Sequence, residues 1–259
     1  LYVGKSDRGT SSLNGKNVEG THGIAHQPLV EVVPLDNIVP SNGRVALLKV
    51  DAQGWEPSVL IGARRTLEAG HIARMYLEYD PWMLAQSADG SWSAAWEMLQ
   101  KLHEHGFWCV VARPLVCKAQ KNSDVVKRCW ADIACEHDPN HRDTTWMEDI
   151  IGRPWIEPNN ARLRSASSDA RTLTGPSPTP NPTEPRLPSS MPLVANSYPS
   201  ACSFGVRPGD NGLVIDVGTS KEAHDLVCLL RKNTGVQGIG FEPEPSNCQA
   251  AQRAVLRLS

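Results

Sequence analysis

The chain has 259 residues, a formal net charge of −2 and a sequence pI of about 6.5, and this length fits one or two domains. The near-neutral charge gives no basic surface for nucleic acid, and no run of about 18 apolar residues predicts a helix that spans a membrane. Seven cysteines with no CxxC pair predict reduced thiols and favour an intracellular protein, and no secretory leader is visible.

Apolar strand-like runs alternate with helix-like stripes in the first 156 residues. The run VALLKV ends in a polar residue, Asp51, which is typical of a buried parallel strand. The expected elements are, in chain order, strands at 45–51, 75–78, 107–112 and 130–135, with helices at 57–70 and 91–105. No long helix separates the last two strands, so we expect them to pair antiparallel.

The composition changes near Pro158. From there to about Asp210 the chain is rich in Pro, Ser, Thr and Asn, which predicts a disordered linker. Beyond it we expect strands at 212–216 and 236–241, each followed by a helix. The predicted parts are therefore 1–156, the linker 157–210, and 211–259. Alternating strands and helices predict an α/β fold with a mostly parallel sheet covered on both faces.

Two motifs in the last part place polar residues where strands end. VIDVGTS carries Asp216 and Gly218 at the end of one strand, and GFEPEPSN carries Glu242 at the end of the next. The carboxyl edge of such a sheet is where nucleotides bind. A glycine there lets the backbone approach a ligand, and a carboxylate on the second strand can accept hydrogen bonds from ribose hydroxyls.

These motifs resemble the cofactor-binding half of class I S-adenosylmethionine-dependent methyltransferases, and FEPEPSN resembles the FkbM family in particular. The stretches VPLDNI (33–38) and LLKVDAQGWEPSVLIGA (47–63) resemble that family's most specific signature. The resemblance implies a doubly wound, Rossmann-like sheet. It also implies transfer of a methyl group from S-adenosylmethionine to an oxygen of a small-molecule or glycan acceptor, without a metal.

The resemblance also implies roles for individual residues. The cofactor-binding set would be Asp216, Gly218, Thr219, Ser220, Glu242 and Pro243. Asp51 would lie on the methyl-transfer side, and Asp51 and Glu56 are the nearest candidates for a base that helps a hydroxyl attack. His22 and His26 precede this region and are weaker candidates.

The chain departs from the family pattern at two points. Glu222 stands where the family usually has the second glycine of D-x-G-x-x-x-G, and the cofactor half follows the KVDAQG half instead of preceding it. A circular permutant and a window cut from tandem copies both explain the order. The tandem window is favoured because a unit of about 30 residues is missing at the junction, and it makes neighbouring copies of the domain possible partners.

The sequence allows three other interpretations: a zinc site, a different nucleotide cofactor and an inactive module. The set Cys129, Cys135, His137 and His141 does not have the spacing of a usual zinc site, so no metal is expected. An NAD-dependent enzyme is disfavoured because no G-x-G-x-x-G follows the strand at Asp216. An inactive Rossmann-like remnant that serves as a structural or interaction module remains the alternative function.

Overall fold

The computed structural model describes most of the two predicted parts of the chain. The described residues are 1–5, 11–15, 18, 23–88, 91–113, 115–118, 127–153, 156–157, 210–218, 224–233, 235–242 and 245–256. The predicted linker at 157–210 therefore lies outside the described residues, apart from the residue at each of its ends.

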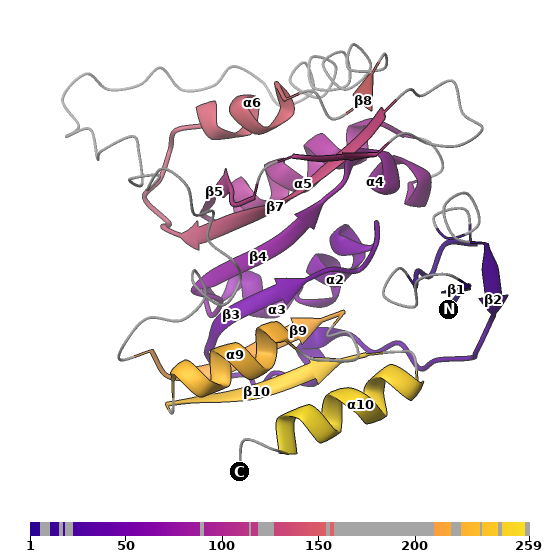
Figure 1. Cartoon of the computed structure of the whole chain (residues 1–259). Helices are drawn as coiled ribbons and strands as arrows, with labels where there is room; N and C mark the ends of the chain where they lie inside the picture. The colour runs from indigo at the N-terminus through magenta and orange to yellow at the C-terminus, as the bar shows by residue number, and fades with distance from the viewer. Residues whose placement is uncertain are drawn as a thin grey trace.

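Strands and helices alternate along the described chain (Figure 1). In chain order the elements are β1 (Val3–Gly4), β2 (Ile24–His26), η2 (Leu35–Asn37), β3 (Val45–Val50), α2 (Glu56–Gly62), α3 (Arg64–Glu68), β4 (Arg74–Tyr79), α4 (Pro81–Ser87), α5 (Ser93–Glu104), β5 (Phe107–Val111), β6 (Val116–Lys118), β7 (Lys127–His137), α6 (Thr145–Ile151), β8 (Ile156–Glu157), β9 (Gly212–Val217), α9 (His224–Lys232), β10 (Val236–Phe241) and α10 (Pro245–Leu256).

One sheet joins the two ends of the chain. Its strands follow the order β10-β9-β3-β4-β7-β5, and the first four run parallel to one another. Strand β7 pairs antiparallel with both β4 and β5, which confirms the antiparallel pairing expected for the last two strands. Because β3 and β9 are direct neighbours, the segments on either side of the predicted linker lie side by side in the sheet (Figure 1).

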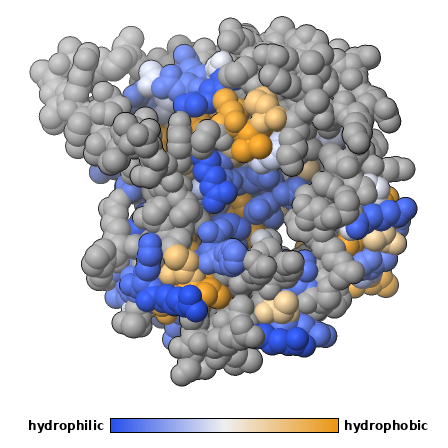
Figure 2. Space-filling model, viewed as in Figure 1, coloured by the Kyte–Doolittle hydropathy of each residue, from blue (hydrophilic) through white to orange (hydrophobic). Residues whose placement is uncertain are grey.

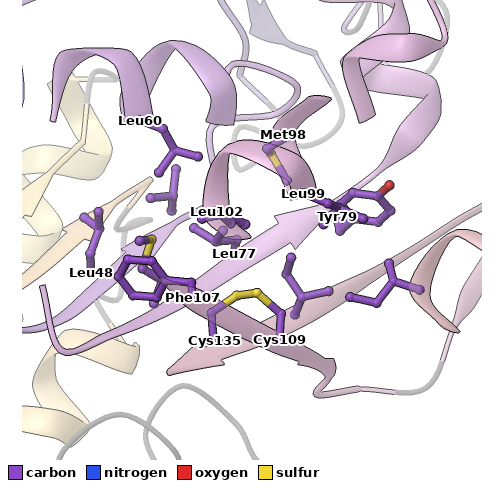
Figure 3. Close-up of a cluster of buried hydrophobic side chains, with 14 of the residues drawn as sticks. Leu48, Leu60, Leu77, Tyr79, Met98, Leu99, Leu102, Phe107, Cys109 and Cys135 are labelled. Carbon is purple, nitrogen blue, oxygen red and sulfur yellow. A yellow bond between two sulfur atoms is a disulfide. The ribbon is translucent and has the colours of Figure 1, made fainter. Parts of the chain in front are cut away.

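The first layer of the core lies between the sheet and helices α2 to α6. All six residues of β3 are buried, as expected for a central parallel strand that is covered on both faces. Leu48, Leu77 and Phe107 pack here with Leu60 of α2 and Leu99 of α5 (Figure 3). This layer is large and apolar, and it accounts for the hydrophobic runs of the first part of the sequence.

The opposite face of the sheet is covered by α9. Leu226 and Leu229 of this helix pack with Leu47 of β3, Tyr76 of β4 and Val214 of β9. Helices therefore cover both faces of a mostly parallel sheet, which confirms the predicted α/β class and agrees with a Rossmann-like arrangement.

Two aspartates fix where helices begin on the first face. Asp80 ends β4 and accepts hydrogen bonds from the backbone N–H groups of Trp82 and Met83, both at 3.1 Å, so it is the N-cap of α4. Asp36 accepts from the N–H of Arg65 at 2.7 Å and from the N–H and hydroxyl of Thr66. These hydrogen bonds link η2 to the start of α3.

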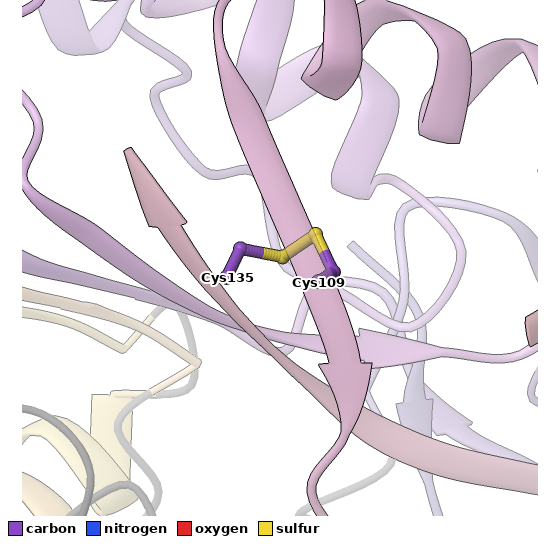
Figure 4. Close-up of a disulfide and its surroundings, with 2 residues drawn as sticks. All are labelled: Cys109 and Cys135. Carbon is purple, nitrogen blue, oxygen red and sulfur yellow. A yellow bond between two sulfur atoms is a disulfide. The ribbon is translucent and has the colours of Figure 1, made fainter. Parts of the chain in front are cut away.

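Disulfides correct the prediction of reduced thiols. Cys109 and Cys135 lie opposite each other on β5 and β7, with Cα atoms 4.0 Å apart, and form a disulfide (Figure 4). Cys117 and Cys129 are paired in the same way across β6 and β7, and Cys228 is also disulfide-bonded. The prediction failed because the strand register, which sequence spacing does not show, brings these side chains together. The thiols therefore give no support to an intracellular location.

Among the described residues, every helix is too short or too polar to cross a membrane.

Candidate functional site

The parallel strands all end at one edge of the sheet. At the boundary between β9 and β3 the helices change faces, since α9 covers one face and α2 and α3 cover the other. In open α/β sheets the crevice outside such a boundary, at the carboxyl ends of the strands, is where ligands bind. Asp51 follows β3 at this edge, and Gly218 follows β9.

A cavity of about 140 Å³ opens at this boundary. Its lining is mainly charged and polar, and it includes Asp51, Glu78 and Gly218 from the ends of three neighbouring strands. Hydrophilic residues gather near the middle of this face of the molecule (Figure 2). The edge predicted from the sequence is therefore a polar pocket, which we call the switch-point pocket.

Lys49, which lines the pocket, forms an ion pair with Asp216. The Nζ atom lies 3.1 Å from Oδ1 of Asp216 and 3.9 Å from Oδ2 of Asp225. Burial lowers the pKa of Lys49, but the carboxylates of Asp216, Asp51 and Asp225 more than reverse this and raise the pKa above its usual range. Burial raises the pKa of Asp216 and the adjacent ammonium opposes that rise. The short contact and the surrounding carboxylates keep Lys49 protonated, and the ion pair links β3 to β9.

Gly218 is required by the packing of the two central strands. Its φ is +82°, and a Cβ atom at this position would overlap the backbone oxygen of Asp51. Two hydrogen bonds tie this region together, from Asp51 N to Val217 O and from Gly218 N to Phe241 O, both 3.0 Å. The sequence predicts a glycine that admits a ligand, and in the structure this glycine lines the pocket and also admits the neighbouring strand.

Asp51 is joined to a second carboxylate through an amide. The Nε2 atom of Gln53 donates to Oδ1 of Asp51 at 2.7 Å and to Oε2 of Glu78 at 2.8 Å. Both carboxylates line the switch-point pocket. Glu78 was not among the predicted site residues, although its place near the end of β4, next to β3, was a signal available in the sequence.

Glu56 lies in a different environment from Asp51. It is 1% exposed, and its Oε1 atom accepts hydrogen bonds from the N–H groups of Ala52 at 2.8 Å and Gly54 at 3.2 Å. Burial, reinforced by the negative charge of Asp51, raises the pKa of Glu56 to about 8. Glu56 is not among the residues that line the switch-point pocket. It closes the turn that follows β3.

A tyrosine, an aspartate and an arginine form another wall of the pocket. The hydroxyl of Tyr76 donates to Oδ2 of Asp132 at 3.1 Å, and Nε of Arg113 lies 3.0 Å from the same oxygen. Burial raises the pKa of Tyr76, and the charge of Asp132 adds to the rise. Tyr76 lies on β4, Asp132 on β7, and Arg113 follows β5. Because the three come from separate strands, no local sequence pattern indicates that they meet.

The remaining predicted site residues are distributed as follows. Glu242 follows β10 at the same edge of the sheet. Thr219, Ser220 and Pro243, together with Glu222 and His22, lie outside the described residues. His26 belongs to β2, which forms a separate two-stranded sheet with β1. Cys129 and Cys135, two members of the zinc set that was considered, are held in disulfides.

Comparison with known families relates the first part of the chain to a family of methyltransferases. Residues 2–109 match the family model described as the methyltransferase FkbM domain, a span that contains β3, Asp51, Gln53 and Glu78. The matched span is less than half of the 259 residues and does not reach β9 or β10. No curated protein and no solved structure matches the chain.

Proposed function

From the match of residues 2–109 to the methyltransferase FkbM domain, we propose that the chain is an FkbM-like methyltransferase and that it transfers a methyl group from S-adenosylmethionine to an oxygen of a small molecule or a glycan. The observation that carries the proposal is the switch-point pocket, where Gly218 on β9 and Asp51 on β3 meet. The pocket brings Gly218, from the motif VIDVGTS that resembles a cofactor-binding motif, next to Asp51, which lies within the span matched by the family model.

The charges at this edge suit a cationic cofactor. The lining contains the carboxylates of Asp51, Glu78, Asp132 and Asp225, against two permanent cations, Lys49 and Arg113. Each of those cations already lies close to a carboxylate. The pocket therefore carries an excess of negative charge, and a low-dielectric cleft of one sign attracts ligands of the other sign.

Glu242 and Asp51 have distinct tasks in this proposal. Glu242, at the end of β10, would accept hydrogen bonds from the ribose hydroxyls. When bound, S-adenosylmethionine supplies an electrophilic methyl group on a positively charged sulfur. Asp51 would accept the proton of the acceptor hydroxyl as its oxygen attacks. The fixed positions of β3 and β9 would hold the acceptor in line, so that orientation supplies a large part of the rate.

Asp51 is the stronger of the two predicted bases. Its carboxylate lines the pocket, whereas the carboxyl group of Glu56 is buried against backbone N–H groups of its own turn. We therefore assign proton transfer to Asp51 and a structural task to Glu56.

The first experiment is a calorimetric titration of the purified chain with S-adenosylhomocysteine. We expect micromolar binding by the wild type, and at least a tenfold weaker affinity for Glu242→Gln and for Gly218→Ala. Gly212→Ala is the matched control, because Gly212 also has a positive φ and a close backbone neighbour, Arg44, but lies at the opposite end of β9. Thermal unfolding of each variant separates loss of the fold from loss of the site.

A folded wild-type chain that binds no S-adenosylhomocysteine would refute the proposal. The chain would then be an inactive Rossmann-like module with a structural or interaction role. Equal loss of binding in Gly212→Ala and Gly218→Ala would show that strain in β9, and not a ligand at its carboxyl end, controls the result.

A further inference from the structure

Gln53 has a backbone conformation that non-glycine residues rarely adopt. Its φ is +53°, and it is the one non-glycine residue with a positive φ in the part of the chain that the structure describes. Such a conformation costs about 1–3 kcal/mol and persists only when the surroundings enforce it. A residue held in this way next to a pocket calls for a functional explanation.

The surroundings enforce this conformation from both sides. The hydroxyl of Ser12, which is 2% exposed, donates to the backbone oxygen of Gln53 at 3.0 Å. Glu56 accepts hydrogen bonds from the N–H groups of the residues before and after Gln53. The turn is thus fixed by a side chain from the N-terminal segment and by the start of α2, and the side chain of Gln53 is directed to one place.

That place lies between two carboxylates. A side-chain amide nitrogen has two hydrogens to donate, and Gln53 uses one on Asp51 and the other on Glu78, at 2.7 and 2.8 Å. Two carboxylates that line one pocket repel each other, and neither can donate a hydrogen bond when ionised. The amide bridges them without adding a charge, so it can hold the two carboxylates side by side.

We propose that Gln53 is a positioning residue that holds Asp51 and Glu78 as a carboxylate pair facing the sulfonium end of S-adenosylmethionine, and that this pair selects the cationic cofactor over its neutral product. This inference rests on the proposed function. After methyl transfer the sulfur carries no charge, so the attraction to the pair is lost. The pair therefore favours exchange of the spent product for fresh cofactor.

The size of the expected effect follows from Coulomb's law. One unit charge about 5 Å from another in a partly buried site changes binding by roughly tenfold or more. The effect depends only on the charge of the ligand. A variant that merely distorts the pocket weakens both ligands, so the ratio of the two affinities isolates the electrostatic contribution.

The experiment measures the dissociation constants of S-adenosylmethionine and S-adenosylhomocysteine for the wild type and three variants. In Glu78→Gln we expect the preference for the cationic ligand to fall by about tenfold, and in Gln53→Ala to fall by a smaller factor, because both charges remain but are no longer held together. Glu97→Gln is the matched control, since it removes one charge from an exposed position on α5 that is not part of the lining of the switch-point pocket. We expect no change in its ratio.

A second variant at Gln53 tests the bridge itself. Gln53→Met keeps the approximate length of the side chain, removes both hydrogen bonds to Asp51 and Glu78 and keeps the net charge of the wild type. We expect it to lower the preference for the cationic ligand by about the same factor as Gln53→Ala. It also keeps the test decisive if Gln53→Ala does not fold.

The outcomes separate the two proposals. Failure of the wild type to bind either ligand would overturn the proposed function. Binding of both ligands with the same ratio in the wild type and Glu78→Gln would overturn the charge selection and leave the proposed function intact. A changed ratio in Glu78→Gln with an unchanged ratio in Gln53→Met would overturn the positioning role of Gln53.

Discussion

Replacing Glu56 with glutamine should change how the stability of the chain depends on pH. Glutamine keeps an oxygen at the Oε1 position, which can still accept the hydrogen bonds from Ala52 and Gly54. It has no proton to release. The substitution therefore removes the titration of a fully buried carboxyl group while it preserves the turn after β3.

The direction and size of the effect follow from the pKa. Burial raises the pKa of Glu56 from 4.5 to about 8, so the folded chain keeps this proton at pH values where the unfolded chain has lost it. Stability from this group is fully present below pH 4.5 and is lost as the pH rises toward 8. A rise of this size corresponds to about 5 kcal/mol between the two limits.

Urea unfolding at several pH values from 5 to 8.5 provides the assay. We expect the free energy of unfolding of Glu56→Gln, relative to the wild type, to rise by several kcal/mol over this range, and we expect no such trend for Glu97→Gln. A difference between the wild type and Glu56→Gln that is independent of pH would refute the reasoning, because it would mean that Glu56 is ionised in the folded chain.

Three further predictions concern structural contacts. Asp36→Ala removes three hydrogen bonds to the start of α3 and should lower the free energy of unfolding, measured by urea titration, by about 2–4 kcal/mol. Partial burial raises the pKa of Asp36, but the hydrogen bonds from Thr66 and Arg65 outweigh it and lower that pKa. The loss of stability in Asp36→Ala should therefore shrink below about pH 4, where the carboxylate of the wild type becomes protonated. Replacing Cys109 and Cys135 together by alanine should cost about 3 kcal/mol, and both should resist alkylation in the wild type until a reductant is added. Lys49→Met leaves a buried carboxylate without its ammonium and should cost about 3–5 kcal/mol in the same unfolding assay.

Local patterns in the sequence were enough to predict the elements around the site. The apolar run before Asp51 and the runs before Gly218 and Glu242 are the neighbouring parallel strands β3, β9 and β10, and their polar ends do lie at one edge of the sheet. Periodicity and strand-end polarity are properties of short segments, so they can be recognised without knowing the fold. The candidate site could be located for the same reason.

The contacts that define the pocket depend on segments far apart in the sequence. Lys49 and Asp216 are separated by 167 positions, and no local pattern pairs them. The bridge from Gln53 to Glu78 depends on a left-handed turn that is favoured for glycine and not for glutamine, so propensity argued against it. The disulfides depend on register between strands, which the spacing of cysteines does not reveal.

Because β3 and β9 are neighbours in the sheet but far apart in the sequence, the pocket forms only when two distant parts of one chain associate. How readily they associate depends on the effective concentration of one part near the other. The strand that carries Asp51 and the strand that carries Asp216 are joined by more than 150 residues, so their association resembles binding between two tethered partners. A single cut in the chain between residues 157 and 200 would turn this association into a reaction between two molecules. The pocket of the cut protein should then form only above a threshold concentration, and ligand binding should weaken on dilution, whereas in the intact chain it should not.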